Sequence, residues 1–371
     1  MSVVQAICGC GRERGIMGFV VADKRSAESV STATHTIPIV QVRSILQGAL
    51  HQGYAPEPLL RRAGISPGLL DSSRSRVSQH QYARLIRVLR RVTRDELWGL
   101  CERPLPLGSF ALGTGLMVRS QTLGEALRTG FHFYHLLLDD FVMRLVRQGD
   151  TAYVRLLDQR PPDPRQDYAK RTALFFTFGL ASWLVERRLP VNRVCLSAPE
   201  PPEYTETTRL FQAPVAYGAD YTGLSFDALW LYHPIRQDEQ SLARFLRRAP
   251  TNLLVKYRDE GRITERIRRY LRRHMAMRLP SLEEVAEELR MTPQTLRRRL
   301  REEGEGYQTL KDEVRRDAAV DLLGRPDLSL MEIANRTGFS EPSTFHRAFK
   351  KWTGLAPGEY RQTVLESLGN Q

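Results

Sequence analysis

Cysteine is scarce in this chain of 371 residues. The four cysteines, Cys8, Cys10, Cys101 and Cys195, are too few and too scattered to form the disulfide framework of a small secreted protein. Cys8 and Cys10 also lack the usual spacing of zinc ligands and have no adjacent histidine. We therefore expect the protein to work in a reducing cytoplasm and to hold no structural metal.

Long apolar runs are also missing. No stretch approaches the length of a membrane span, and the short mixed opening is not typical of a signal peptide. We expect no contact with a membrane. The opening residues 1–35 are rich in Gly, Ser and Thr, and we expect them to form a mobile tail.

Known catalytic signatures are absent. The chain has no Gly-rich phosphate loop with a Walker lysine, no GxSxG elbow and no HExxH motif. His132 and His135 lie near Asp139 and Asp140, but histidines on a helix with aromatic neighbours more often pack or hydrogen-bond than bind a metal. The sequence therefore favours a protein that is not an enzyme, with no catalytic residues, no metal and no cofactor.

Positive charge is in excess. The formal net charge of +13 and the pI of about 9.9 favour an anionic partner such as nucleic acid. The excess is not concentrated at the carboxy-terminal end, because the segment from Lys256 onwards carries 23 basic and 19 acidic side chains. A prediction of DNA binding therefore depends on where individual arginines lie.

The segment SLMEIANRTGFSEPSTFHRAFKKWTG, residues 329–354, predicts two short helices separated by a glycine-containing turn. Ser329 and Ser340 are good N-cap residues, and Gly354 is placed to end the second helix in a left-handed conformation. The apolar residues at helical spacing are Leu330, Ile333 and Ala334 in the first helix, and Phe345, Phe349 and Trp352 in the second. This order of parts is that of a helix-turn-helix unit, whose second helix enters the major groove of DNA.

An upstream segment, SLEEVAEELRMTPQTLRRRLREEG, repeats this plan from Ser281. A capped helix leads to a turn at Arg290 and Met291, and Thr292 with Pro293 opens a second helix. The apolar pair Leu296 and Leu300 takes the places of Phe345 and Phe349. We therefore predict two helix-turn-helix units in tandem.

The stretch GYQTLKDEVRRDAAVDLLGRP between the repeats predicts one continuous connecting helix. Its expected core face comprises Leu310, Val314, Ala318 and Leu322, and Gly324 with Pro326 closes it. A helix of about eighteen residues spans about 27 Å. Successive major grooves on one face of DNA lie about 34 Å apart, so such a rod can hold two reading helices near one turn of DNA.

The tandem units and the stretch SEPSTFHRAFKKWTGLAPGEYR closely resemble the carboxy-terminal DNA-binding domain of the AraC/XylS family of bacterial transcription regulators. The resemblance runs from Arg262 to Tyr360. It implies that the second helix of each repeat is a recognition helix. Carried over by position, the base-reading residues are Gln294, Arg297 and Arg298 in the first helix, and Ser343, His346 and Arg347 in the second.

Side-chain chemistry agrees with these positions. An arginine can donate two hydrogen bonds to guanine and a glutamine can pair with adenine, so Arg298 and Arg347 are the strongest candidates for base readout. The expected phosphate-contacting residues are Thr292, Arg299, Thr344 and Lys350. For the three consecutive arginines of the first helix the alternative is a solvated face, or a local pair with Glu302 or Glu303.

The amino-terminal half predicts a separate α+β domain. Helices are expected within 39–65, 78–93, 122–140 and 168–189, with Tyr82, Leu85, Ile86 and Leu89 facing inward in the second. Residues 141–158 predict a hairpin that turns at Gly149 and Asp150, and 191–199 and 215–227 complete an antiparallel sheet. The predicted fold is this α+β domain followed by an all-α DNA-binding domain with two helix-turn-helix units joined by a linker helix. The predicted boundaries are 1–35 for the tail, 36–240 for an effector-binding and dimerisation domain, 241–261 for the interdomain linker and 262–371 for the DNA-binding domain.

This half is similar to the helix-rich, arabinose-binding-type effector and dimerisation domain of one branch of the family, through stretches such as GISPGLLD and SQTLGEAL. It lacks the dense succession of short strands of a jelly-roll sugar sensor, so the sequence does not favour a sugar as ligand. An aromatic stripe, Phe175, Phe176, Phe178 and Trp183, predicts either a core or the wall of an apolar effector pocket.

The expected function is that of an effector-responsive activator. The family resemblance implies a homodimer that binds double-stranded promoter DNA, responds to a small molecule and contacts RNA polymerase. Three alternatives stay open: a repressor of the same architecture, an effector-independent nucleoid or RNA-associated protein, and an enzyme with a DNA-binding appendage.

Overall fold

The computed structural model describes residues 36–161, 163–200, 207–248, 263–275 and 279–369. The predicted tail, Cys8, Cys10 and most of the predicted linker lie outside these residues. The predicted domain boundaries stay predictions.

The described chain begins with a helical layer. A capping box of Ser78 and Gln81 starts its third helix, and Tyr82, Leu85 and Ile86 are buried as predicted. A short two-stranded antiparallel sheet, which the sequence did not predict, pairs Ile37 with Val77. The elements are β1 (Thr36–Pro38), α1 (Ile39–His51), α2 (Pro56–Ala63), the 3-10 helix η1 (Pro67–Asp71), β2 (Arg76–Ser78) and α3 (Gln79–Thr93).

A five-stranded sheet follows in the order β3-β4-β7-β5-β6. The predicted hairpin is confirmed, and Gly149 adopts the left-handed conformation (φ 57°) that its tight turn needs. The strands are β3 (Phe141–Gln148), β4 (Thr151–Asp158), β5 (Arg193–Cys195), β6 (Val215–Ala216) and β7 (Thr222–Asp227). The predicted all-antiparallel sheet is wrong at one pair, because β5 and β6 run parallel. The connection between them contains α7 (Thr207–Phe211) and is a crossover rather than a hairpin.

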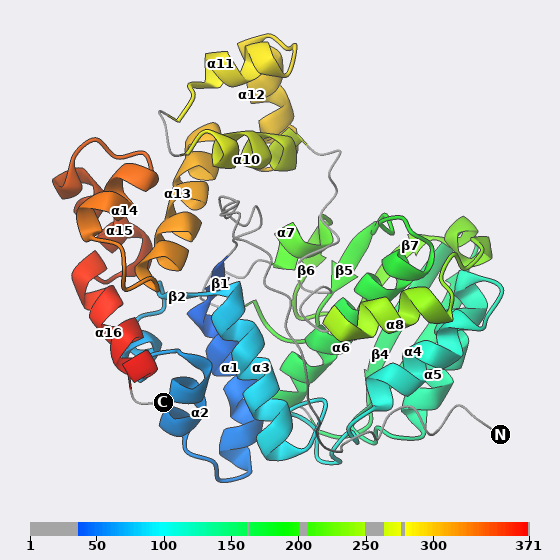
Figure 1. The fold of residues 1–371 in the computed structure, drawn as a ribbon. Coiled ribbons are helices and arrows are strands. Elements are labelled where there is room, and N and C mark those ends of the chain that lie inside the picture. Colours follow the sequence, from blue (N-terminus) through cyan, green and yellow to red (C-terminus); the bar gives the residue numbers. More distant parts are fainter. Residues whose placement is uncertain (1–35, 162, 201–206, 249–262, 276–278, 370–371) are drawn as a thin grey trace, which may run out of the picture. The chain divides into compact units, whose positions relative to one another are not determined.

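Helices pack against this sheet and against one another (Figure 1). They are α4 (Ser109–Val118), α5 (Leu123–His135), α6 (Pro164–Leu184), the 3-10 helix η2 (Ala228–Tyr232) and α8 (Glu239–Arg248). The sequence did not predict α4, because the apolar residues of this helix are spread over all of its faces and form no one-sided stripe. Helix α8 occupies part of the predicted linker, and its Phe245 ring stacks on Trp183 of α6 at 4.3 Å.

From Ile263 onwards the described elements are all helices, which confirms the predicted fold class. The helices are α10 (Ile263–Arg273), α11 (Leu282–Glu288), α12 (Pro293–Glu302), α13 (Tyr307–Leu323), α14 (Leu330–Arg336), α15 (Pro342–Thr353) and α16 (Pro357–Gly369). Ser281 and Ser329 cap α11 and α14 in full capping boxes, as predicted. Ser340 does not cap α15. Glu341 holds that position without a side-chain bond, because the helix starts one residue later, at Pro342.

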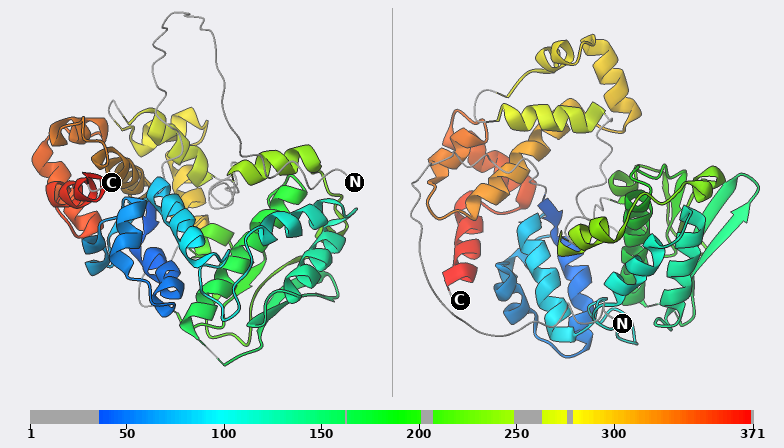
Figure 2. Two further views of the ribbon diagram at one scale, coloured as in Figure 1. Left: turned by 60° about the horizontal axis from the view of Figure 1, so that its bottom comes forward. Right: turned by 45° about the vertical axis from the view of Figure 1, so that its right-hand side comes forward.

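The connecting helix α13 contributes side chains to two separate cores. Figure 2 shows the backbone of the carboxy-terminal helices, in which α13 contacts both α10 and α14. Leu310 and Val314 near its start join the core of the first helix-turn-helix unit, as predicted. Beyond them the predicted Ala318 and Leu322 are half-buried and pack against the cores, and Ala319, Val320 and Leu323, which were not predicted, are buried more completely. The buried stripe shifts around the helix because its second half packs against a different set of helices.

Buried polar contacts join the helical layer to the carboxy-terminal helices. The Thr36 hydroxyl donates to Asp317 of α13 at 2.6 Å, and the Tyr360 hydroxyl of α16 donates to the Arg76 carbonyl oxygen at 2.7 Å. All four residues are at most 7% exposed. We call this set, Thr36, Arg76, Asp317 and Tyr360, the docking seam.

Candidate DNA-binding surface and apolar pocket

Helix α12 presents its polar side chains to solvent because its apolar side is buried. The Thr292 hydroxyl accepts from the Thr295 backbone N–H at 3.1 Å and so caps the helix. Leu296 and Leu300 enter the core of the first unit at 0% and 2% exposure. The four remaining candidate residues of this helix, Gln294, Arg297, Arg298 and Arg299, are exposed, as is Thr292.

Two of the α12 arginines have acidic neighbours. Arg297 lies 2.9 Å from Glu283, and Arg298 lies 3.8 Å from Glu302 one helical turn away. Exposed pairs of this kind contribute about 0–1 kcal/mol, so a phosphate or a base edge can replace the carboxylate. Glu303, also considered as a partner, instead accepts the backbone N–H groups of Ile263 and Thr264 at 3.0 and 3.1 Å. It caps α10.

Helix α15 has the same arrangement. Phe345 and Phe349 are fully buried, and their ring centroids lie 5.8 Å apart. The Phe349 ring meets Tyr360 of α16 edge to face at 5.4 Å. The five candidate residues Ser343, Thr344, His346, Arg347 and Lys350 are all exposed. The Gly354 residue that ends the helix is left-handed (φ 82°), as predicted.

The turns between the paired helices are equivalent in the two units. Arg290 in the first turn and Gly338 in the second both adopt left-handed conformations, with φ 53° and 77°. Arg315 of α13 fixes the second turn, because its guanidinium donates to the Gly338 carbonyl oxygen at 2.8 Å and lies 4.4 Å over the Phe339 ring. Burial lowers the pKa of Arg315. The connecting helix α13 therefore contacts the turn between α14 and α15 directly.

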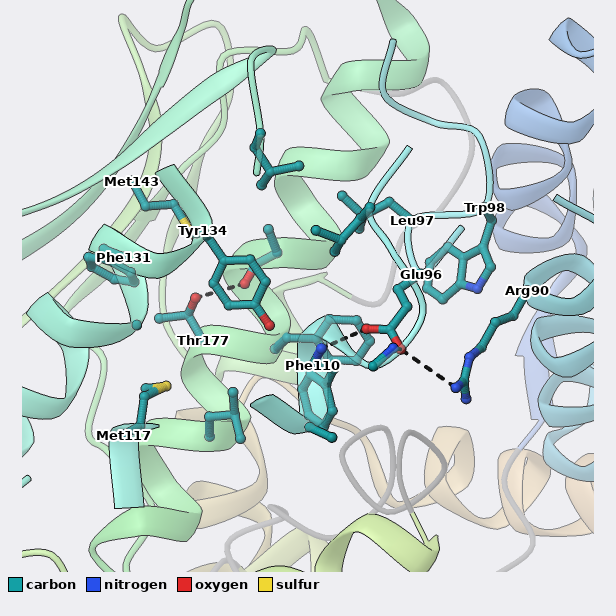
Figure 3. Close-up of a pocket in the computed structure, with 18 of the residues that line it drawn as sticks. Arg90, Glu96, Leu97, Trp98, Phe110, Met117, Phe131, Tyr134, Met143 and Thr177 are labelled. Atoms are coloured by element: carbon teal, nitrogen blue, oxygen red, sulfur yellow. Dashed lines mark hydrogen bonds and ion pairs between the residues drawn. The ribbon is translucent and has the colours of Figure 1, made fainter. Parts of the chain in front are cut away.

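The amino-terminal domain contains an apolar pocket with a cavity volume of about 210 Å³ (Figure 3). Its walls come from α3, α4, α5, α6, β3, α8 and the loop that carries Glu96 to Leu105. Large apolar side chains dominate the lining, among them Leu97, Phe110, Met117, Phe131, Met143 and Phe176. We refer to this cavity as the apolar pocket.

Of the lining residues that the structure describes, Glu96 alone is acidic, and its charge is balanced. Its two oxygens accept the backbone N–H groups of Gly108 and Phe110 at 2.8 and 2.6 Å, at the start of α4. Arg90 of α3 lies 3.6 Å away (Figure 3). Because α4 begins at this carboxylate, the pair both neutralises the pocket and fixes one of its walls.

Tyr134 of α5 supplies a polar group inside the pocket. Figure 3 shows its hydroxyl directed toward the side of the pocket formed by Glu96 and Phe110. Burial, with a smaller contribution from the charge of Glu96, raises the pKa of Tyr134. The hydroxyl is therefore protonated at neutral pH and is able to donate a hydrogen bond.

The predicted aromatic stripe divides between core and pocket. Phe176 lines the pocket, whereas Phe175 and Phe178 pack on the Phe211 ring at 6.5 and 5.4 Å. The other lining residues were missed in the sequence, because they come from seven separate segments and no spacing along the chain marks them.

The histidine and aspartate group does not converge. His132, His135 and Asp139 are exposed, whereas Asp140 is fully buried. Asp140 accepts from the Glu102 backbone N–H and the Gln166 side chain, both at 3.0 Å. Within the described ranges, no three His, Cys, Asp or Glu side chains gather as a possible metal site. In the same part of the chain, every helix is too short or too polar to cross a bilayer.

Two family models match the chain. One, described as the arabinose-binding domain of AraC transcription regulator, matches residues 53–235, and a helix-turn-helix domain model matches residues 285–363. The chain belongs to the AraC family of transcription regulators. The two models correspond to the two parts of the fold, and the regulator binds DNA through its helix-turn-helix domain.

Relatives of this AraC-family chain are also regulators. It is 25% identical over 327 residues to the ornithine utilization regulator of Pseudomonas aeruginosa, covering 88% of this chain and 96% of the relative. Over 148 residues it is 32% identical to the HTH-type transcriptional regulator VirS of Mycobacterium tuberculosis, covering 40% and 43%. The crystal structure of the transcriptional regulator CdpR from Pseudomonas aeruginosa matches at 25% identity and a TM-score of 0.30, covering 87% of this chain and 98% of that one.

Proposed function

We propose that this AraC-family regulator is an effector-responsive activator that reads two adjacent major grooves of promoter DNA with α12 and α15. The observation that carries the proposal is the sharing of α13 between two cores. A helix of 17 residues, about 26 Å long, then separates two units of the same design. That length suits reading helices held about one turn of DNA apart.

Within each reading helix we assign separate roles to the exposed side chains. The base-reading residues are Gln294, Arg297, Arg298, Ser343, His346 and Arg347, and the phosphate-contacting residues are Thr292, Arg299, Thr344 and Lys350. Exposure of all ten supports the assignment. The burial of the intervening apolar residues supports it further, because a rigid helix holds base-reading groups in a fixed register.

Family resemblance supports the remaining parts of the proposal. The regulator forms a homodimer in the cytoplasm, contacts RNA polymerase when bound at a promoter, and uses neither a cofactor nor a catalytic step. The amino-terminal domain supplies the response to a small molecule, because it contains a cavity bounded by α8, the last helix that the structure describes before Ile263.

Genome-wide mapping of bound sites, followed by footprinting of one site with purified full-length protein, tests the proposal. We expect protection of two successive major grooves on one face of the duplex, and binding that weakens steeply with salt because phosphate contacts release counterions. Protection of a single groove, or equal binding to any sequence, would contradict it. Transcription in vitro from the mapped promoter distinguishes an activator from a repressor. A decrease in transcript on adding the protein would indicate the repressor alternative.

A further inference from the structure

We infer that the apolar pocket binds an uncharged, mostly apolar small molecule of about ten non-hydrogen atoms, with one oxygen at its polar end. A phenol or an aryl ketone has this chemistry, whereas a sugar and a carboxylic acid do not. The inference deepens the proposed effector response by naming the ligand class of its site.

Cavity volume sets the size of the ligand. An apolar cavity of about 150 Å³ holds benzene, so the cavity of about 210 Å³ accepts a somewhat larger molecule, such as one ring with a short substituent. The surrounding Phe110, Phe131 and Phe176 rings and the Met117 and Met143 side chains are suited to contact an aromatic ring or a short alkyl chain.

The scarcity of polar groups in the lining excludes a sugar. A monosaccharide carries a hydroxyl on almost every carbon, and burying each hydroxyl without a hydrogen-bond partner lowers the affinity. The Thr177 hydroxyl in the lining already donates to the Ala173 carbonyl oxygen at 2.8 Å. The described lining residues therefore offer too few partners for a polyol.

Charge in the pocket excludes a carboxylate. Among the described lining residues there is one cation, Arg90, and one anion, Glu96, and these two lie 3.6 Å apart. A carboxylate ligand would place a second negative charge beside Glu96, and the described lining offers no second cation to balance it. An uncharged ligand leaves the pair and the start of α4 unchanged.

Tyr134 provides the polar end of the site. Among the residues that the structure describes, its hydroxyl has no hydrogen-bond partner. Its pKa is raised, so it remains a neutral donor, and an oxygen of the ligand is the matching acceptor. Placed against Tyr134, the rest of the ligand lies among the apolar side chains.

Helix α8 bounds the pocket and gives binding a route to regulation. Leu246 of α8 lines the cavity, while Phe245 stacks on Trp183 and lies 6.2 Å from the Phe110 ring. Phe110 itself lines the cavity, so a ligand contacts both Leu246 of α8 and the Phe110 ring against which α8 packs. Because α8 is the last described element before Ile263, a shift of α8 displaces the start of the segment that leads to the DNA-binding domain.

Calorimetric titration of the full-length protein without DNA tests the inference. The probes are 4-ethylphenol and acetophenone, with 4-ethylbenzoate and L-arabinose as the charged and polyol comparisons. We expect single-site, saturable binding of the first two and binding of the other two at least about tenfold weaker. Saturable binding of neither uncharged probe, or tighter binding of either comparison compound, overturns the inference.

Variants locate the binding in the apolar pocket. Tyr134→Phe keeps the ring and removes the donor, so affinity for both probes should fall about tenfold. Ala173→Phe fills the cavity from α6, and we expect it to abolish binding. If this variant folds poorly, Ala111→Phe fills the same cavity from α4 and replaces it in the experiment. Tyr54→Phe, which removes a hydroxyl outside the pocket, is the matched control and should bind like the wild type.

The assignment is overturned if Tyr134→Phe binds the probes with unchanged affinity and a correctly folded Ala173→Phe or Ala111→Phe variant does so as well. Binding would then take place outside the apolar pocket. Because the titration contains no DNA, failure of this inference is distinct from failure of the proposed DNA recognition, which footprinting measures.

Discussion

Arg298 and Arg347 are exposed side chains on α12 and α15, each beside a buried residue that fixes the helix. The backbone positions of these arginines are therefore set by Leu296 and Leu300 in one case and by Phe345 and Phe349 in the other. This leaves only the long side chains to adapt to DNA.

Replacement of either arginine separates base reading from phosphate contact. We expect Arg298→Ala or Arg347→Ala to cost about 1–3 kcal/mol on the cognate site and to reduce discrimination at one base pair, because a bidentate contact to guanine is lost. Fluorescence anisotropy with cognate and scrambled duplexes measures both effects. Lys350→Ala is the comparison and should weaken both duplexes alike. An equal loss on both duplexes for an arginine variant would make that arginine a phosphate contact.

Residue-level features were predictable where the physics is local. The capping boxes at Ser281 and Ser329 and the left-handed Gly354 each depend on a few consecutive residues, and all are present. The prediction that Ser340 caps α15 is wrong. Serine is a favourable N-cap residue, but the residue at which a helix starts also depends on tertiary packing. The functional roles of the arginines stay predictions.

At the scale of elements, α13 is one helix with two attachments. Its first half belongs to the core formed with α10 to α12, and its second half packs with α14 to α16. The helix therefore couples two units that would otherwise have separate stabilities.

Cavities at the two ends of α13 should loosen different units. Leu310→Ala and Leu323→Ala each remove a fully buried side chain and should cost about 2–5 kcal/mol. We expect faster amide hydrogen exchange in α10 to α12 for the first variant and in α14 to α16 for the second, measured by mass spectrometry. Loosening of all six helices to the same extent by either variant would show a single cooperative core.

Periodicity predicted most elements but not all of their faces. The β3–β4 hairpin and α3 have clear patterns and were confirmed. The buried face of α13 changes partway along the helix, which a single stripe does not describe, and α4 is apolar on every side. In both cases, tertiary contacts decide what the local pattern leaves open.

For the whole molecule, the docking seam joins the amino-terminal layer to the DNA-binding helices through buried hydrogen bonds. It places a charged residue, Asp317, and a fully buried tyrosine, Tyr360, against backbone and side-chain partners near β1 and β2. Neither the seam nor the pocket was predictable from sequence, since each joins residues that are far apart along the chain.

Removal of one hydroxyl tests the seam. Tyr360→Phe leaves the Arg76 carbonyl oxygen without this donor and should cost about 1–2 kcal/mol. We expect faster hydrogen exchange in both β2 and α16. Thr363→Ala is the matched control, since its hydroxyl bonds within α16 to the Tyr360 carbonyl oxygen. Faster exchange in α16 with β2 unchanged would assign Tyr360 to the helix-turn-helix core alone.

Helix α3 takes part in both sites. It follows directly on β2 at the seam, and Ile86 and Arg90 farther along it line the pocket. A ligand whose binding changes the packing of α3 at the seam links the two equilibria, and each equilibrium then alters the other by the same factor. Binding to promoter DNA would then change the ligand concentration to which the regulator responds. In one cell, DNA-bound and free copies of the regulator would respond at different ligand concentrations.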